Sequence, residues 1–126
     1  MPKDKIAKLN QLLLQKYQTQ VMFTPSAMQD YKSFAVGKRQ DILKLIIKQA
    51  EKGALLKPDG NANRCEGVLH ECAKIKSKSL KLRVIYKPVK LDTGIVRMDI
   101  IAIGPRDDLQ VYKMAIQRLA DCEKQE

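Results

Sequence analysis

The sequence predicts an α+β domain with helices first, an antiparallel run of strands next and a helix last. Apolar residues recur at helical spacing between residues 3 and 52. Between residues 67 and 103 they alternate with polar residues, which is typical of strands. Helical spacing returns over residues 111–119. This order is typical of N-terminal helices packed on one face of a small antiparallel sheet, with a C-terminal helix.

The first half of the chain contains three expected helices and one strand. Residues 3–17 form the first helix, and residues 20–23 form a short strand. Thr24 and Pro25 are a good helix start, because threonine caps the first turn and proline suits it. Gly37 is expected to end that helix. A longer helix over residues 38–52 stops at Gly53, and residues 53–66 read as loop.

The second half contains three expected strands, over residues 67–76, 80–89 and 95–103. A final helix follows, capped by Asp107 or Asp108. A tight turn at Ser79-Leu80 would pair the first two strands so that Lys76 lies opposite Arg83. Directly opposed residues share a face of the sheet. Two sets of residues then separate: the cations Lys74, Lys76, Lys78, Lys81 and Arg83 on one face, and Leu69, Ala73, Ile75, Leu82 and Val84 on the face that the helices cover.

Length and composition limit the class of protein. The chain has 126 residues, which is one domain, and 44% of them are hydrophobic, which excludes a disordered chain. A domain of this size buries about two-thirds of its unfolded surface, so it needs no metal or disulfide to fold. No apolar run approaches the roughly 18 residues of a membrane span, so no membrane partner is expected.

The net charge is +10, which predicts an anionic partner and favours nucleic acid. The alternative is a generally basic protein with a solvated lysine face. The chain has three cysteines, Cys65, Cys72 and Cys122. An odd number of cysteines without a preceding signal peptide favours reduced thiols and a cytoplasmic location. Cys65, His70 and Cys72 have no metal-ligand spacing, so neither a metal nor a cofactor is expected.

The crowded cations permit a specific chemistry. Like charges opposite one another destabilise a hairpin, which suggests that an anion neutralises them. RNA can be cut without a metal if one group takes the 2′-OH proton, another stabilises the charge on phosphorus and a third protonates the leaving oxygen. Arginine suits the second task, because its planar donors match phosphate. A lysine crowded by other cations has a lowered pKa and can act as a base.

Several segments together resemble the RelE toxins of the RelE/ParE superfamily, over about residues 19–120. The segments are Phe23-Thr24-Pro25-Ser26-Ala27, Cys72-Ala73-Lys74-Ile75-Lys76, Leu82-Arg83-Val84-Ile85-Tyr86, Ile101-Ala102-Ile103-Gly104-Pro105-Arg106 and Val111-Tyr112. No single segment is specific, but the ordered set with its cation spacing is. The resemblance implies a RelE-like toxin domain over residues 19–122, preceded by a helical extension over residues 1–18.

RelE toxins are ribosome-dependent endoribonucleases, so the resemblance implies that this chain is a metal-independent mRNA interferase. It implies cleavage of mRNA in the A site of the small ribosomal subunit, by 2′-OH attack on the adjacent phosphate, and a cognate antitoxin as partner. By similarity, Lys74 is the general base and Arg106 the general acid. Lys76 and Arg83 hold the transition-state charge, and Tyr112 orients a nucleotide. Lys78 and Lys81 are expected to bind substrate.

The chain departs from the family pattern in its N-terminal extension and at Pro105, where many relatives carry a basic residue. Some relatives use a Glu/His pair, but His70 and Glu71 are expected to face opposite ways on a strand. Two other functions stay open. One is a ParE-like, non-enzymatic inhibitor of DNA gyrase, although such chains lack the catalytic cations. The other is a plain RNA-binding module, although these usually display aromatic residues on the sheet.

Overall fold

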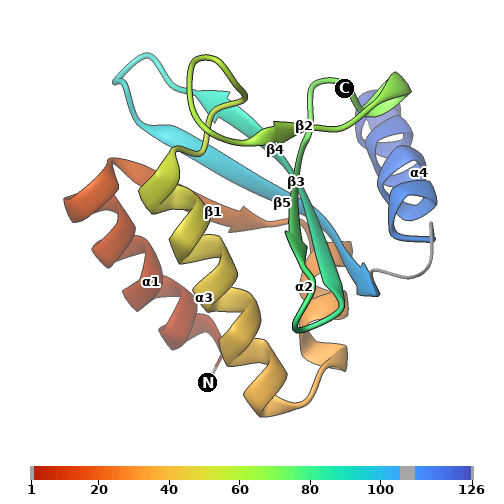
Figure 1. Cartoon of the computed structure of the whole chain (residues 1–126), viewed down its shortest axis with the longest axis horizontal. Helices are drawn as coiled ribbons and strands as arrows, with labels where there is room; N and C mark the ends of the chain where they lie inside the picture. Colours follow the sequence, from red (N-terminus) through yellow and green to blue (C-terminus); the bar gives the residue numbers. More distant parts are fainter. Residues whose placement is uncertain (1, 106–109, 126) are drawn as a thin grey trace.

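The computed structural model describes residues 2–105 and 110–125, with side chains for residues 5–105 and 110–120. The elements follow the expected order of helices, strands and a final helix (Figure 1). They are α1 (Pro2–Tyr17), β1 (Thr19–Phe23), α2 (Pro25–Ser33), α3 (Val36–Lys52), β2 (Asn63–Arg64), the short 3₁₀ helix η1 (Gly67–Leu69), β3 (Ala73–Ser77), β4 (Leu82–Lys90), β5 (Val96–Pro105) and α4 (Gln110–Gln125). The α+β prediction is therefore confirmed.

The five strands form one sheet in the order β1-β5-β4-β3-β2. All neighbouring strands are antiparallel except β1, which runs parallel to β5. The sheet is therefore mixed, where an antiparallel one was expected. Parallel neighbours need a long connection, and here the chain from β1 to β5 passes through α2, α3, the short η1 and the three other strands.

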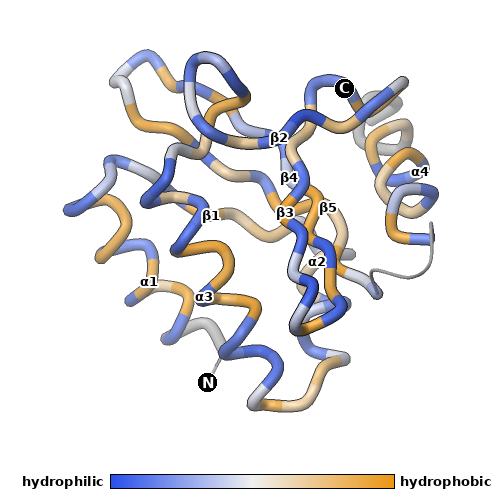
Figure 2. Tube along the Cα trace, in the orientation of Figure 1, coloured by the Kyte–Doolittle hydropathy of each residue, from blue (hydrophilic) through white to orange (hydrophobic). Residues whose placement is uncertain are grey.

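Helices cover both faces of the sheet (Figure 1). α1, α2 and α3 pack on one face through a large core that includes Leu13, Tyr31 and Ile46. α4 packs on the other face through a smaller core that includes Val111 and Ala115. Along α1 and α3, hydrophobic residues interleave with hydrophilic ones (Figure 2), as expected for helices with one buried side. The N-terminal helices thus share one face, as predicted, and the other face is left to α4.

Two of the expected helix boundaries are confirmed. The Thr24 hydroxyl accepts a hydrogen bond from the backbone N–H of Ala27 at 3.2 Å and caps α2, with Pro25 in the first turn. Gly53 ends α3 with a φ of 126°, which lies in the region that favours glycine. The expected cap at Asp107 or Asp108 lies outside the described residues.

The expected break at Gly37 is wrong, because Gly37 lies in the first turn of α3. The chain turns instead at Phe34 and Ala35, which have extended backbones. Arg39 holds this turn, since its guanidinium donates to the carbonyls of Phe34 at 2.8 Å and Lys32 at 2.6 Å. A turn held by side-chain hydrogen bonds to backbone carbonyls is not visible in the spacing of apolar residues.

The first expected strand is shorter than predicted. Residues 67–69 form η1 and β3 begins only at Ala73. Leu69 is consequently buried in the core under α4, where it was expected on the opposite face. His70 and Glu71 lie in the turn after η1, not on a strand.

α1 packs into the same core as the rest of the chain. Leu9 and Leu13 are buried in the core under α1, α2 and α3. The side-chain amide of Asn10 accepts from the N–H of Val21 at 2.6 Å and donates to its carbonyl at 3.0 Å. Because β1 is an edge strand, Asn10 takes the place of a neighbouring strand there. The division of the chain into residues 1–18 and 19–122 stays a prediction.

Candidate functional site

The register between β3 and β4 is the one expected from the sequence. Lys76 pairs with Arg83, Lys74 with Ile85 and Ser77 with Leu82. Ile85 lies in the core under α4, so Lys74, Lys76 and Arg83 all belong to that face. Three of the five expected cations therefore gather on one face of the sheet.

Lys78 and Lys81 do not extend this row as paired strand residues. Both lie in the turn of residues 78–81, outside the ladder, and both are exposed. Lys81 has a φ of 55°, a turn conformation that takes it out of the strand. Their expected role in binding substrate stays a prediction, and Arg106 lies outside the described residues.

Tyr112 comes to the same face from α4. Its ring lies against the Arg83 guanidinium, with 5.1 Å from the guanidinium carbon to the ring centroid, which is a cation–π contact. Gly104 pairs with Arg83 in the sheet and allows α4 this close, because a Cβ there would lie 3.2 Å from the Cβ of Val111. The structure thus brings Tyr112 next to Arg83, and the role that the resemblance implies for Tyr112 stays a prediction.

The electrostatics of this pair suit an anion. The Arg83 Nε is buried and has no hydrogen-bond partner among the described residues. A buried donor without a partner is costly, and a phosphate oxygen would satisfy it. Burial raises the pKa of Tyr112, and the positive charge of Arg83 partly offsets that rise. Tyr112 therefore stays a neutral hydroxyl at physiological pH.

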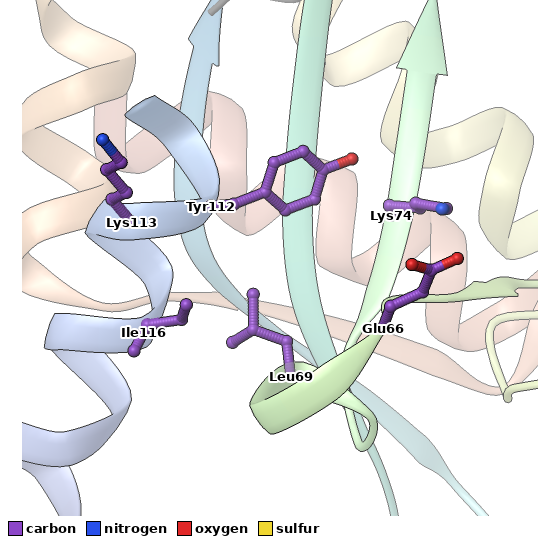
Figure 3. A pocket seen from close by; sticks show the side chains of 6 residues that line it. All are labelled: Glu66, Leu69, Lys74, Tyr112, Lys113 and Ile116. Atoms are coloured by element: carbon purple, nitrogen blue, oxygen red, sulfur yellow. The ribbon is translucent and has the colours of Figure 1, made fainter. Parts of the chain in front are cut away.

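A pocket of about 410 Å³ opens between α4, η1 and β3 (Figure 3). Lys74 and Glu66 lie on one side of it, and the hydroxyl of Tyr112 points toward Lys74. Leu69 and Ile116 supply an apolar wall, and Lys113 completes the lining from α4. A pocket with an aromatic ring, an apolar wall and a lysine suits a nucleotide, whose base is flat and whose phosphate is charged.

Glu66 and Lys113 were not expected in the site. Glu66 precedes η1 in a segment that reads as loop, so no periodicity places it. Lys113 is one of many lysines, and only its position next to Tyr112 on α4 distinguishes it. The pattern of the sequence held no signal for either residue.

α4 is fixed in place by an ion pair with α2. The Arg118 guanidinium donates to both carboxylate oxygens of Asp30, at 2.7 and 3.1 Å. The same two side chains also bond to backbone groups of β5 that lie beyond the end of β1, where no described strand pairs with them on that side. Arg118 donates to the carbonyl of Ile101, and Asp30 accepts from the N–H of Ile103. This arrangement, the Asp30–Arg118 clamp, holds the helix that carries Tyr112.

Two cysteine thiols lie beneath the site. Cys65 and Cys72 are buried and unbridged, and burial raises the pKa of both, that of Cys72 to about 12. Such thiols are poor nucleophiles. Among the described residues no group of three or more His, Cys, Asp or Glu side chains is placed to hold a metal ion. None of the described helices has the length and apolar character needed to cross a membrane.

The sequence matches no protein-family profile and no curated protein. Solved structures do match. An arginine-to-alanine double mutant of E. coli toxin RelE in the free state has 23% identity and a TM-score of 0.57, over 78% of this chain and 94% of that chain.

The isolated E. coli RelE toxin also has 23% identity, with a TM-score of 0.51 over 79% of this chain and 96% of that chain. The RelE double mutant in complex with an antitoxin RelBc peptide has a TM-score of 0.50, at 23% identity over 75% of this chain and 90% of that chain. The expected RelE-like fold is therefore confirmed.

Proposed function

We propose that this protein is the toxin of a toxin–antitoxin module and a ribosome-dependent endoribonuclease that cuts mRNA in the A site. One observation carries the proposal: Lys74, Lys76, Arg83 and Tyr112 meet on one face of a RelE-like fold. These are four of the five positions that match the catalytic set of RelE toxins. The fifth, Arg106, lies outside the described residues and is included by resemblance alone.

The proposed reaction is an in-line transesterification. The 2′-oxygen forms a bond to the adjacent phosphorus while the bond from phosphorus to the 5′-oxygen breaks. The 2′-OH proton passes to Lys74 as the general base, and Arg106 gives a proton to the departing 5′-oxygen. Lys76 and Arg83 stabilise the charge that develops on the phosphoryl oxygens. The products are a 2′,3′-cyclic phosphate and a 5′-hydroxyl.

The pocket supports this assignment of roles. Lys74 lines it and the hydroxyl of Tyr112 faces Lys74, so a nucleotide bound against Tyr112 would lie beside the proposed base (Figure 3). The buried Nε of Arg83 supplies a donor without another described partner. All of these groups are side chains, and no cofactor is part of the proposal.

The proposed partners are the translating ribosome, its mRNA and a cognate antitoxin that holds the toxin inactive. The support for an antitoxin is the RelE structure in complex with an antitoxin RelBc peptide, whose toxin shares this fold. The net charge of +10 supports a partner rich in phosphate. The proposed site of action is the cytoplasm, where ribosomes are found.

The test is primer extension on a defined mRNA in cell-free translation, with and without ribosomes. We expect cleavage on translating ribosomes only, and a loss of about a hundredfold or more in Arg83→Ala and in Lys74→Ala. Lys90→Ala is the control, because Lys90 is an exposed lysine at the far end of β4. Its cleavage should equal that of the wild type.

Two outcomes would overturn the proposal. Cleavage of free mRNA without ribosomes would make the protein a general ribonuclease that uses the same site. Absence of cleavage, together with inhibition of supercoiling by DNA gyrase, would assign it to the non-enzymatic class.

A further inference from the structure

A second pocket lies around the edge of β3 from the candidate site, next to α3. Its volume is about 170 Å³. Lys48 and Lys52 line it from α3, Asn63 from β2, and Lys74 and Lys76 from β3. Of the described residues that line this pocket, none is acidic. We call it the α3–β3 pocket.

The charge of the α3–β3 pocket is unusual for a helix surface. Lys48 and Lys52 are one turn apart on α3, and like charges at this spacing destabilise a helix. In the described part of the chain, no carboxylate lies within ion-pair distance of Lys48 or Lys52. Both side chains are exposed, so their ammonium groups are available to an anion from solution.

The sheet edge adds to this chemistry. β2 pairs with β3 only at Ala73 and Lys74, so within the described chain residues 75–77 have no strand neighbour on that side. The pocket lies where β2 ends, and Asn63, the first residue of β2, brings an exposed side-chain amide to it. Ammonium groups and an amide are hydrogen-bond donors, and such donors bind phosphate oxygens.

The two pockets are neighbours that share one lining residue. Lys74 lines both of them, so one side chain separates the pocket of Tyr112 from the α3–β3 pocket. A polymer of phosphodiesters bound in the first pocket would place a neighbouring phosphate near Lys74. An acidic peptide fits less well, because the small pocket is lined by four lysines around a narrow polar space and offers little apolar surface.

We infer that the α3–β3 pocket is a second phosphate-binding site, which holds a non-scissile phosphate of the RNA strand bound in the candidate site. The inference rests on the proposed function for the RNA strand itself. It adds Lys48, Lys52 and Asn63 to the substrate-binding surface, although none of them belongs to the segments that resemble the RelE family.

The test measures binding of 2′-O-methyl RNA, which cannot be cleaved, by fluorescence anisotropy. The variant is Lys48→Gln/Lys52→Gln, and the matched control is Lys44→Gln/Lys16→Gln. Lys44 lies one turn before Lys48 on α3 and Lys16 lies on α1, and both are exposed lysines that do not line the pocket. Both double variants lose the same charge, so a difference between them reports position and not net charge.

For an RNA of about eight nucleotides, we expect the Lys48→Gln/Lys52→Gln variant to bind about tenfold more weakly than the control. The salt dependence of its binding should also be shallower by about 0.7 per lost phosphate contact. For a dinucleotide, which has a single phosphate between its sugars, the two variants should bind equally. That dependence on length is the signature of a site for a neighbouring phosphate.

Equal binding of the two variants to the longer RNA would overturn the inference. It would also be overturned if Lys48→Gln/Lys52→Gln weakened binding of the dinucleotide as much as binding of the longer RNA. Binding of polyglutamate that is stronger than binding of RNA, and sensitive to Lys48 and Lys52, would assign the pocket to an acidic protein instead. The proposed function fails separately, by absence of ribosome-dependent cleavage in the wild-type protein. Cleavage that depends on Lys74, with RNA binding indifferent to Lys48 and Lys52, would overturn the second site alone.

Discussion

Arg83 links the cations of the sheet to Tyr112 on α4. Its guanidinium lies against the ring of Tyr112, and its Nε has no hydrogen-bond partner among the described residues. In the proposed reaction Arg83 stabilises the charge on a phosphate, and the ring of Tyr112 packs against its guanidinium. The cation–π contact itself depends on the ring and not on the hydroxyl. The packing of the Tyr112 ring on Arg83 and the proposed contact of Tyr112 with a nucleotide can therefore be separated by substitution.

The first prediction concerns Tyr112. Tyr112→Phe keeps the ring and should lower cleavage by less than about tenfold, whereas Tyr112→Ala removes the cation–π contact and should lower it about a hundredfold. The measurement is single-turnover cleavage on stalled ribosomes, with thermal unfolding to check the fold. Equal losses in the two variants would show that the hydroxyl, not the ring, is the group that matters.

At the scale of elements, three helices are held by side chains that bond to the edges of the sheet. Asn10 of α1 pairs with the outer edge of β1, and the Asp30–Arg118 clamp ties α2 and α4 to the edge of β5. Unpaired backbone groups at a buried edge cost free energy, so these side chains stabilise the positions of their helices. Each contact can be tested by substituting its side chain and, as a control, a residue that does not make the contact.

Asn10→Ala should lower the free energy of unfolding by about 1–3 kcal/mol, because the N–H of Val21 loses its acceptor. Gln11→Ala is the control, since Gln11 is exposed on the same helix, and it should change stability by less than about 0.5 kcal/mol. The measurement is unfolding in urea.

A chain without residues 1–18 should lose more free energy of unfolding than Asn10→Ala does, since it also loses Leu9 and Leu13 from the core. Full stability of that shortened chain would support the predicted division at residue 18.

The Asp30–Arg118 clamp makes a prediction about α4. Asp30→Ala removes the carboxylate that accepts from Arg118 and from the N–H of Ile103, and leaves Arg118 only the carbonyl of Ile101, so we expect the free energy of unfolding to fall by about 1–3 kcal/mol. Hydrogen exchange of the α4 amides should rise, and cleavage should fall although Asp30 does not line the pocket. The control is Asp99→Ala, which breaks an ion pair with Arg97 within one strand. Unchanged exchange in α4 after Asp30→Ala would contradict the role of the clamp.

Local sequence patterns predict some of the pairings between these elements and cannot predict others. The register of β3 and β4 follows from the alternation of Ile75, Leu82 and Val84, because a slip by one residue would bury the lysines. The parallel pairing of β1 with β5 and the ion pair of Asp30 with Arg118 join residues that lie more than 70 positions apart in the sequence. The periodicity of apolar residues describes only near neighbours, so it cannot predict these contacts. The short η1 interrupts an alternating segment, so Leu69 was placed on the wrong face and Glu66 was missed.

At the scale of the whole molecule, the global free energy of unfolding depends on pH through groups buried in both cores. Burial raises the pKa of Cys72 from 9.0 to about 12. Burial also raises the pKa of Tyr86, whose hydroxyl donates to the carbonyl of Ala54 at 2.7 Å. Above pH 9.0 for Cys72 and above pH 10.0 for Tyr86, the unfolded chain releases the proton while the folded chain keeps it. The unfolded state then binds fewer protons, so the free energy of unfolding falls as pH rises.

The last prediction follows from that sign. Between pH 9.0 and about 12, Cys72 alone should lower the free energy of unfolding by up to about 1.4 kcal/mol per pH unit, and below pH 9.0 its effect should vanish. Cys72→Ala should therefore be less stable at neutral pH but decline less steeply in alkali, as measured by urea unfolding across this range. Val84→Ala is the control: it truncates a buried side chain that does not titrate, so its stability should run parallel to that of the wild type. A Cys72→Ala curve that also ran parallel would mean that the thiol ionises as readily in the folded protein as in the unfolded chain. The core under α4 would then admit water to Cys72, which would contradict the close packing that α4 and the candidate site require.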